Sequence, residues 1–305
     1  MSASHPHPRL SVVVCTHNPR LEILERTLDH LRRQDFGDRD WELLLIDNAS
    51  ATPLDAANTV QWHPHGRLIR ENRVGHTWAR YRGFQESAGE WIIFVDDDNL
   101  LAPDYLSKCV QRIEEFPQLG VFGSCTIVPE FETEPAPRVK PFLPFLAIRD
   151  GTKPAWSNQY DFAAFPCGAG MAIRRSVGVH YYDTIKDTAA MNLGRKGTGM
   201  NAGDDTALVL AALAQGFGTG VFPDQRLTHV IPKGRLEWNY LKRLVTGISR
   251  SLTLLKFDMG MQPRTVFAAV KMLASGLLML ARNPRQLAFH WCLWKGQLQA
   301  WLQRT

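Results

Sequence analysis

The first 130 residues alternate between short apolar runs and segments with helical periodicity, and this alternation restricts the fold more than any other feature. Between several of the runs, apolar residues recur at helical spacing, as in Leu21, Leu24, Leu28 and Leu31. The runs rich in β-branched and aromatic residues are predicted to be strands and span 10–15, 41–46, 67–70, 91–95 and 121–128. Buried strands that alternate with helices are typical of a mostly parallel sheet with helices on both faces. We therefore expect an α/β fold.

The composition is that of a globular protein in a reducing compartment. The 305 residues are 45% hydrophobic, which is enough to bury a core. The five cysteines include no CxxC pair, and an odd number cannot close fully into disulfides. Residues 1–10 lack the apolar run of a signal peptide. These features favour a cytoplasmic location.

Charge is distributed unevenly along the chain. The net charge is +5, but residues 229–305 contain twelve basic residues and only two acidic ones, Glu237 and Asp258. That segment therefore carries +10, and the preceding 228 residues carry −5. A uniformly basic nucleic-acid-binding protein would not have an acidic body. The C-terminal end is expected to face an anionic surface, for which charge alone makes phospholipid as good a candidate as nucleic acid.

The chain beyond residue 236 is predicted to be helical, apolar and basic. Residues 266–281 form an apolar run that is slightly short for a membrane span and has Lys271 near its centre. Residues 287–302 mix Trp291, Trp294 and Trp301 with basic side chains, which suits a helix lying in the headgroup region. The alternative is that these helices pack on the preceding domain. We expect one domain over 1–235 and a helical, amphipathic extension over 236–305 in peripheral contact with an anionic membrane, with no nucleic acid bound.

Asp96, Asp97 and Asp98 are the strongest chemical signal in the sequence. They directly follow the apolar run 91–95, and ligands of open α/β sheets bind beyond the carboxyl ends of the strands. Three adjacent carboxylates repel one another unless a cation or hydrogen-bond donors lie among them. Divalent Mg²⁺ and Mn²⁺ take oxygen ligands. The alternative, a solvated turn that caps the helix starting near Ala102, is less favoured.

Asp204 and Asp205 form a second acidic pair. They follow the glycine-rich stretch 194–203 and precede a predicted helix. Aspartate at a helix start is a common N-cap, and taken alone the pair indicates a cap. One carboxylate can cap the helix while its neighbour acts as a general base in a cleft. His229, after a strand-like segment, is either a packed histidine or a third metal ligand.

Polar residues also follow the first two predicted strands. Thr16, Asn18 and Asp47 are ordinary turn formers, but at adjacent strand ends they can together bind the base and ribose of a nucleotide. Arg73 and Arg80 are candidates for contacts with diphosphate oxygens, the alternative being solvated side chains on a helix.

Seven short motifs in consistent order over residues 9–250 resemble those of family-2 glycosyltransferases. In the sixth motif Asp204 stands where the family usually has glutamate. The motifs are Cys15-Thr16-His17-Asn18-Pro19-Arg20, Ile46-Asp47-Asn48-Ala49-Ser50, Asn72 through Gly83, Phe94-Val95-Asp96-Asp97-Asp98, Gly168 through Arg175, Gly203-Asp204-Asp205, and Pro223 through Arg235.

The resemblance implies a GT-A-like, Rossmann-type fold, a nucleotide-sugar donor, a divalent metal (Mn²⁺ or Mg²⁺) and inversion at the anomeric carbon. Asp205 would be the catalytic base, with Asp204 beside it. The nucleotide would be contacted by Thr16, Asn18, Asp47, Arg80, Asp96 and Asp97. The metal would be bound by Asp98, and His229 is the candidate for a further ligand. The acceptor side would be formed by Gly168, Ala169, Gly170 and Arg235.

The expected function is an inverting, metal-dependent glycosyltransferase at the cytoplasmic face of a membrane, with a glycan or lipid-linked intermediate as its hydroxyl acceptor. One alternative is sugar transfer to a polyprenyl phosphate, and another is a catalytically silent nucleotide-binding scaffold. A third alternative, a nucleotidyltransferase, would be expected to have a glycine- and lysine-rich loop after the first strand. This chain has Thr16-His17-Asn18-Pro19-Arg20 there instead.

Overall fold

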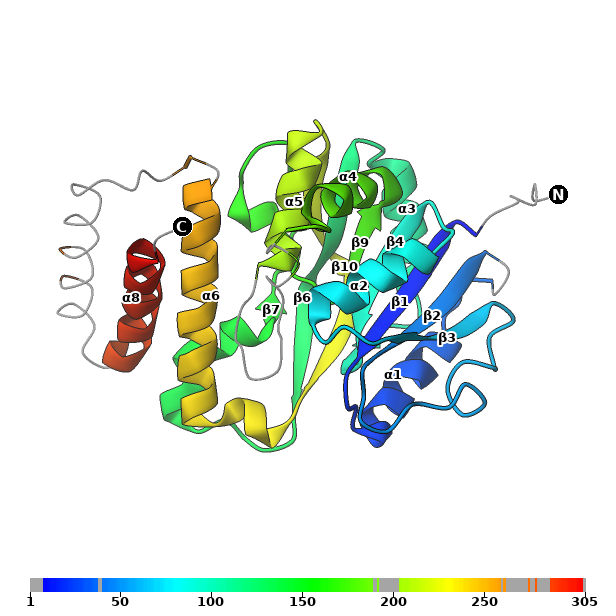
Figure 1. Cartoon of the computed structure of the whole chain (residues 1–305), viewed down its shortest axis with the longest axis horizontal. Coiled ribbons are helices and arrows are strands. Elements are labelled where there is room, and N and C mark those ends of the chain that lie inside the picture. Colours follow the sequence, from blue (N-terminus) through cyan, green and yellow to red (C-terminus); the bar gives the residue numbers. More distant parts are fainter. Residues whose placement is uncertain are drawn as a thin grey trace. The chain divides into compact units, whose positions relative to one another are not determined.

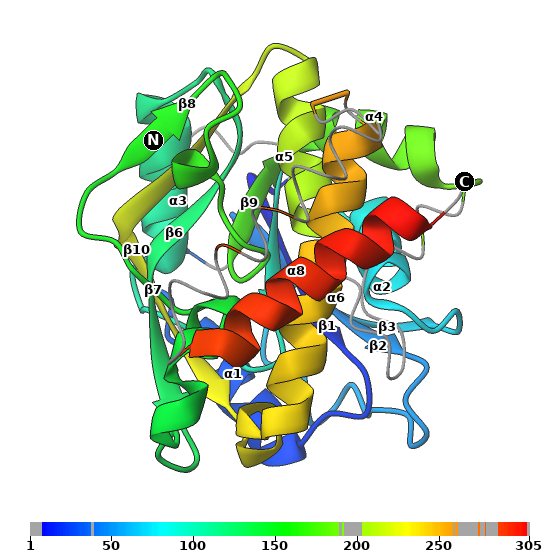
Figure 2. The same cartoon turned by 90° about the vertical axis from the view of Figure 1, so that its left-hand side faces the viewer.

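The computed structural model describes residues 8–37, 40–188, 191, 203–258, 260–261, 274, 278 and 286–303. They divide into two compact units (Figures 1 and 2). Unit 1 comprises Met1–Glu130, Ala147–Asn192 and Asp204–Val230, and unit 2 comprises Phe131–Leu146, Leu193–Gly203 and Ile231–Thr305. Unit 2 thus takes in residues 131–146 and 231–235, while the domain boundary at residue 235 stays a prediction.

A ten-stranded sheet forms the centre of unit 1, with the strand order β3-β2-β1-β4-β9-β6-β10-β5 and with β7 and β8 paired to β6 and β10. Strands β3, β2, β1 and β4 pair in parallel. The pairs β4–β9, β9–β6, β6–β7, β8–β10 and β10–β5 are antiparallel. The α/β fold is confirmed, and its parallel part is the N-terminal half. The strand bounds are β1 Leu10–Thr16, β2 Trp41–Asn48, β3 Gly66–Glu71, β4 Trp91–Asp96, β5 Asn99–Leu101, β6 Leu119–Phe131, β7 Arg149–Asp150, β8 Ala155–Ser157, β9 Met171–Arg174 and β10 Gly218–Ile231.

Helices cover both faces of the parallel strands, because alternate side chains of a strand point to opposite faces. On one face, Leu24 and Leu28 of α1 share a buried cluster with Val12. On the other, α2 approaches so closely that a Cβ on Gly83 would lie 2.2 Å from Cγ1 of Val13. The helices of unit 1 are α1 Leu21–Arg32, α2 His76–Glu86, α3 Tyr105–Glu115, α4 Arg175–Ile185 and α5 Asp204–Ala214, with the short 3₁₀ helix η2 at Phe162–Ala164.

The strand register brings the predicted donor-side motifs to one edge of the sheet. Thr16 at the end of β1 is paired with Asp47 of β2, and Cys15 is paired with Asp96 at the end of β4. A shift of one residue in the pairing would move every side chain of a strand to the opposite face of the sheet, and packing against the helices on each face disfavours it. The adjacency of these motifs is therefore fixed by the apolar strands before them.

Unit 2 contains two packed helices, α6 (Trp238–Asp258) and α8 (Leu287–Leu302), with the 3₁₀ helices η1 (Pro137–Leu146) and η4 (Lys233–Leu236) (Figure 2). A Cβ on Gly296 would lie 2.4 Å from the Thr246 carbonyl oxygen, so glycine permits the close approach of α8 to α6. The predicted apolar run 266–281 lies outside the described residues apart from positions 274 and 278. Within the described part of the chain, no helix has both the length and the apolar character needed to traverse a bilayer.

Candidate active site

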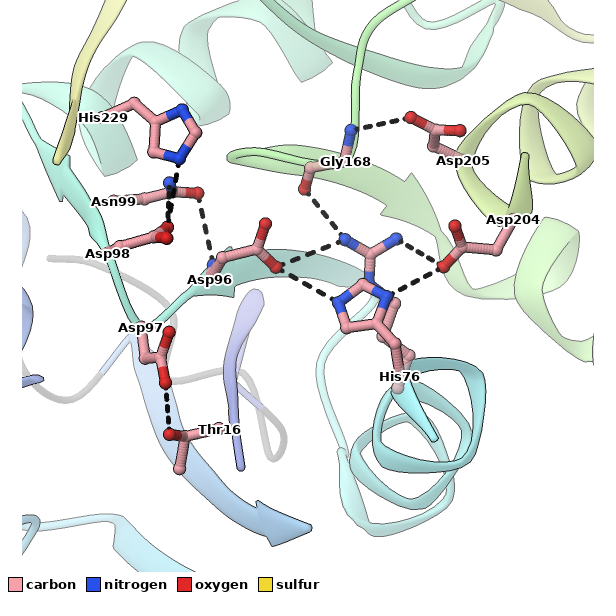
Figure 3. A network of polar contacts seen from close by, with 11 residues as sticks. Thr16, His76, Asp96, Asp97, Asp98, Asn99, Gly168, Asp204, Asp205 and His229 are labelled. Atoms are coloured by element: carbon pink, nitrogen blue, oxygen red, sulfur yellow. Dashed lines mark hydrogen bonds and ion pairs between the residues drawn. The ribbon is translucent and has the colours of Figure 1, made fainter. Parts of the chain in front are cut away.

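The carboxylates of the aspartate triplet point to separate partners at the turn between β4 and β5 (Figure 3). Thr16 donates its hydroxyl hydrogen to Asp97. The Asp98 carboxylate accepts a 3.0 Å hydrogen bond from the Asn99 side chain, and the same oxygen lies 3.5 Å from Nε2 of His229. This separation of partners removes the repulsion that the sequence implied.

Asp96 faces the other way, toward the first turn of α2 (Figure 3). Its Oδ1 lies 3.2 Å from Nε2 of His76 and 3.6 Å from Nη2 of Arg80. The opposite sides of the same two side chains contact Asp204 at the start of α5, with 3.1 Å from Nδ1 of His76 and 3.1 Å from Nη1 of Arg80. Two acidic motifs that are more than a hundred positions apart in the sequence are therefore joined through His76 and Arg80.

Arg80 is buried, with 2% of its surface exposed, and it does not have the solvated position of a typical helical arginine. Besides its two carboxylate partners, it donates a hydrogen bond of 3.2 Å to the carbonyl oxygen of Gly168. A Cβ on Gly168 would lie 2.4 Å from Nη2 of Arg80, so only glycine fits beside the guanidinium. Burial lowers the pKa of Arg80, but the carboxylates of Asp204 and Asp96 outweigh it and raise the pKa, so the group is always charged.

Asp204 and Asp205 are chain neighbours with opposite pKa shifts. Burial raises the pKa of the Asp204 carboxyl, but the charge of Arg80 and the hydrogen bond from His76 outweigh it and hold the pKa well below its usual range. Burial also raises the pKa of Asp205, and the negative charge of Asp204 raises it further. Asp205 is therefore the weaker acid of the pair and, when ionised, the stronger base.

Backbone groups hold the Asp205 carboxylate in place. Its Oδ2 accepts a hydrogen bond of 3.2 Å from the Gly168 N–H, and its Oδ1 accepts one of 2.7 Å from the Thr206 N–H. The Gly168 backbone thus contacts the Asp205 carboxylate with its N–H and the Arg80 guanidinium with its carbonyl.

The predicted acceptor-side residues fall into both units. Gly168, Ala169 and Gly170 precede β9, where the Gly170 carbonyl accepts a hydrogen bond of 2.7 Å from the buried Tyr105 hydroxyl. Gly170 has φ +70, and a Cβ there would lie 2.4 Å from the Tyr105 oxygen. Arg235 lies in η4 of unit 2. The acceptor roles of these residues stay predictions.

The predicted nucleotide residues at the ends of β1 and β2 form a well-ordered turn. The buried Asp47 carboxylate accepts hydrogen bonds from the Ser50 and Leu54 N–H groups and pairs with Arg70 at 2.6 Å. Burial raises the pKa of Asp47, but these hydrogen bonds together lower it below its ordinary value. Asn18, exposed and in the left-handed region at φ 49, accepts from the Ala51 N–H.

Asp98 and His229 fit a divalent metal only as part of a larger ligand set. A carboxylate oxygen and an imidazole nitrogen that face each other at 3.5 Å are suitable ligand types, and both side chains are buried. Among the described residues there is no group of three histidine, cysteine or acidic side chains placed to hold a metal ion. A pair of protein ligands suits a metal such as Mg²⁺ or Mn²⁺ that is completed by water and substrate phosphates.

Sequence reasoning missed one residue of this network and the burial of another. His76 is the first residue of α2, and nothing in its local sequence indicates that it faces carboxylates from two other elements. The burial of Arg80 was likewise unexpected, although Gly83 one turn later signals that this helix packs closely on the sheet. Of the glycine-rich stretch 194–203, only Gly203 belongs to the described residues.

Comparison with known proteins gives a consistent result. The family model described as Glycosyl transferase family 2 matches residues 11–178, more than half of the chain. A β-1,3-glucosyltransferase of Campylobacter jejuni, named for its GalNAc(5)-diNAcBac-PP-undecaprenol substrate, is 32% identical over 129 residues, which are 40% of each protein. An N-acetylglucosaminyltransferase of Rhizobium sp. is 23% identical over 269 residues, 81% of this chain and 57% of that protein. The chain thus spans less than two thirds of these relatives.

Solved structures show the same fold. The mannosyltransferase PcManGT of Pyrobaculum calidifontis, in complex with GDP-Man and Mn²⁺, superposes with a TM-score of 0.60 at 16% identity and covers 97% of this chain and 88% of its own. GalNAc-T7 with UDP, GalNAc and Mn²⁺ gives a TM-score of 0.51 at 17% identity, covering 79% of this chain and 48% of its own. At these identities the likeness establishes the fold, and it confirms the GT-A-like architecture expected from the motifs.

Proposed function

The chain belongs to glycosyl transferase family 2, and on this basis we propose that it transfers a sugar from a nucleotide-sugar donor to a hydroxyl group of a glycan or lipid-linked acceptor, with inversion at the anomeric carbon. The observation that carries this proposal is the convergence of the two acidic motifs on Arg80, which contacts Asp96 at 3.6 Å and Asp204 at 3.1 Å. A donor-side cluster and a base-bearing helix start are the parts that such a transfer requires.

The donor lies over the edge formed by β1, β2 and β4. Thr16, Asn18 and Asp47 end the first two strands and contact the base and ribose, while Asp96 and Asp97 face the ribose and diphosphate. The buried carboxylate of Asp47 is fixed by Arg70 and by two backbone N–H groups, so this edge is rigid before the donor arrives. Arg80, which pairs with Asp96 and Asp204, orients the acidic groups that surround the diphosphate.

Asp98 and His229 are the residues that would hold a divalent metal. When bound there, Mn²⁺ or Mg²⁺ would act as a Lewis acid that offsets the negative charge of the departing diphosphate. The solved mannosyltransferase with GDP-Man and Mn²⁺ supports this assignment by its fold.

Asp205 removes the proton of the acceptor hydroxyl. The hydroxyl oxygen forms the new bond to the anomeric carbon while the bond to the diphosphate oxygen breaks on the opposite face. The electron pair of the broken bond leaves with the nucleoside diphosphate, and the proton passes to the Asp205 carboxylate. Burial and the neighbouring charge of Asp204 raise the pKa of Asp205, which makes it a better proton acceptor than a solvated carboxylate.

The acceptor is proposed to be lipid-linked or part of a growing polysaccharide. The undecaprenol-linked substrate in the name of the Campylobacter jejuni relative supports this. In unit 2, the apolar side chains of Leu287, Trp291 and Leu302 on α8 are about half exposed or more. Together with the basic residues of this segment they support peripheral contact with an anionic membrane at its cytoplasmic face.

A panel of UDP-, GDP- and dTDP-sugars tests the proposal. With Mn²⁺ present, the correct donor should raise the melting temperature, because a ligand that binds only the folded state stabilises it by about 2.7 kcal/mol at a hundredfold excess over Kd. The stabilising donor should then yield a transferred sugar of inverted anomeric configuration. No stabilisation and no transfer with any donor would contradict the proposal and favour a catalytically silent scaffold.

A further inference from the structure

We propose that His76 is a positioning residue of the transfer site: its imidazole, protonated on both nitrogens, bridges Asp96 and Asp204 and thereby joins the end of β4 to the helix that presents the base. This inference rests on the proposed function, because the base and the donor side are defined by it. Figure 3 shows the His76 ring lying between the two carboxylates.

The geometry requires both ring nitrogens to act as donors. Nδ1 lies 3.1 Å from an oxygen of Asp204 and Nε2 lies 3.2 Å from an oxygen of Asp96. An ionised carboxylate only accepts hydrogen bonds, whereas a neutral imidazole has one donor and one acceptor nitrogen. With two acceptors facing it, the ring satisfies both contacts only as an imidazolium.

The charges around the ring favour the same state. Among the described residues, Asp96 from β4, Asp204 from α5 and Arg80 from α2 itself face the ring. Burial and the charge of Arg80 lower the pKa of His76, but its hydrogen bonds to Asp204 and Asp96 outweigh them and raise it. Two carboxylates and two cations then make a neutral group of four.

Helix stability gives no reason for a cation at this position. His76 is the first residue of α2 after Gly75, and the N-terminal end of a helix dipole disfavours positive charge. A leucine at residue 76 would therefore leave the helix at least as stable. The histidine is explained by what it contacts across the site and not by the stability of its own helix.

The bridge acts on the base through Asp204. His76 and Arg80 keep Asp204 ionised and fixed at the start of α5, and Asp205 is the next residue of the same turn. Without His76, Asp204 loses one of its two cationic partners, and the first turn of α5 keeps only the link to β4 that runs through Arg80. The Asp205 carboxylate then has a wider range of positions relative to the donor, which should slow turnover more than donor binding.

The first test is spectroscopic and independent of catalysis. In histidine-¹⁵N-labelled protein at pH 7, the resonance that disappears in His76→Leu should have both ring nitrogens protonated. In Asp204→Asn, the ¹⁵N chemical shifts of the His76 ring should move toward those of a neutral imidazole. A neutral His76 ring at this pH in the unmodified chain would overturn the bridge. Because no substrate is present, failure here is distinct from failure of the proposed function, which the donor panel reports.

The second test compares three variants in the transfer reaction. His76→Leu fills space without a donor, and His76→Lys keeps the charge and the donors. His30→Leu removes a half-buried histidine whose Nδ1 lies 2.9 Å from the Leu101 carbonyl oxygen. We expect His76→Leu to lower kcat about 10- to 100-fold with the donor KM changed less than about threefold. His76→Lys should recover part of the loss, and His30→Leu should leave kcat unchanged.

Packing and positioning roles give opposite results. If His76 only fills space, His76→Leu retains kcat and His76→Lys loses it, which would overturn the inference. A double variant sharpens the result, because His76→Leu combined with Asp204→Asn should be little slower than the slower single variant if both act through one contact. Multiplicative losses in the double variant would also contradict the bridge. The melting temperature of each variant separates these losses from unfolding.

Discussion

The two acidic motifs of the site both consist of aspartates, but they arrange these carboxylates in different ways. At the β4–β5 turn, the side chains of Asp96, Asp97 and Asp98 point to different partners (Figure 3). At the start of α5, Asp204 and Asp205 remain side by side, and one is held by cations while the other is held by backbone N–H groups.

The difference teaches how one residue type supplies two chemical roles. Separating the partners of the triplet yields carboxylates suited to binding cations and ribose. In the pair the two pKa values lie apart: burial and the charge of Asp204 raise the pKa of Asp205, while Arg80 and His76 lower that of Asp204. Pairs of titratable groups whose pKa values diverge are where acid and base roles are found.

The largest expected effect comes from removing the base of the pair. Asp205→Asn should lower kcat about 10³-fold for a hydroxyl acceptor, because general base catalysis is worth about 10²- to 10⁴-fold. Single-turnover transfer with the donor found in the panel measures it. Asp183→Asn, which alters an exposed carboxylate of α4 paired with Lys186, is the control and should change nothing. An unaffected rate would contradict the base assignment and favour a phosphate acceptor, which needs no base.

The next effect concerns the triplet. Asp98→Asn should weaken Mn²⁺ binding about 10- to 100-fold, since a neutral amide replaces a charged oxygen ligand. Calorimetric titration of Mn²⁺ in the presence of nucleoside diphosphate measures the affinity. The same titration with Asp205→Asn should give the unmodified value. Equal affinities in Asp98→Asn and the unmodified chain would show that the triplet does not hold the metal.

The coupling within the pair predicts a shift in pH dependence. A base must be ionised, so kcat/KM should fall as the pH drops through the raised pKa of Asp205. Asp204→Asn removes the neighbouring negative charge, and the acidic limb of the profile should move to lower pH even though the rate is reduced. If the acidic limb of the kcat/KM profile does not move in Asp204→Asn, that limb does not reflect the ionisation of Asp205.

The smallest effect is expected from loss of the hydrogen bond between Thr16 and Asp97. Thr16→Val removes the hydroxyl that donates to this carboxylate and keeps the shape of the side chain. Loss of one such hydrogen bond costs about 1 kcal/mol, which is about fivefold in binding. The donor KM should rise by that factor with kcat unchanged. A larger fall in kcat than in affinity would mean that the triplet also contributes to the chemical step.

The sequence allowed the donor-side edge to be predicted because its determinants are local. The apolar run before Asp96 and the runs before Thr16 and Asp47 predict parallel strands, and parallel strands end at one edge. The contacts of His76 and Arg80 were not predictable in this way. They depend on where α5 begins relative to β4, and that distance is set by packing among elements that are far apart in the chain.

Gly168 is a backbone position at which substitution is expected to be poorly tolerated. Its backbone serves two partners at once, and a methyl group there would collide with Arg80. Random mutagenesis of the neighbouring loop should therefore return active clones that vary on either side of this position but not at it. Under the proposed function, changes in acceptor specificity would therefore have to arise at positions around this glycine.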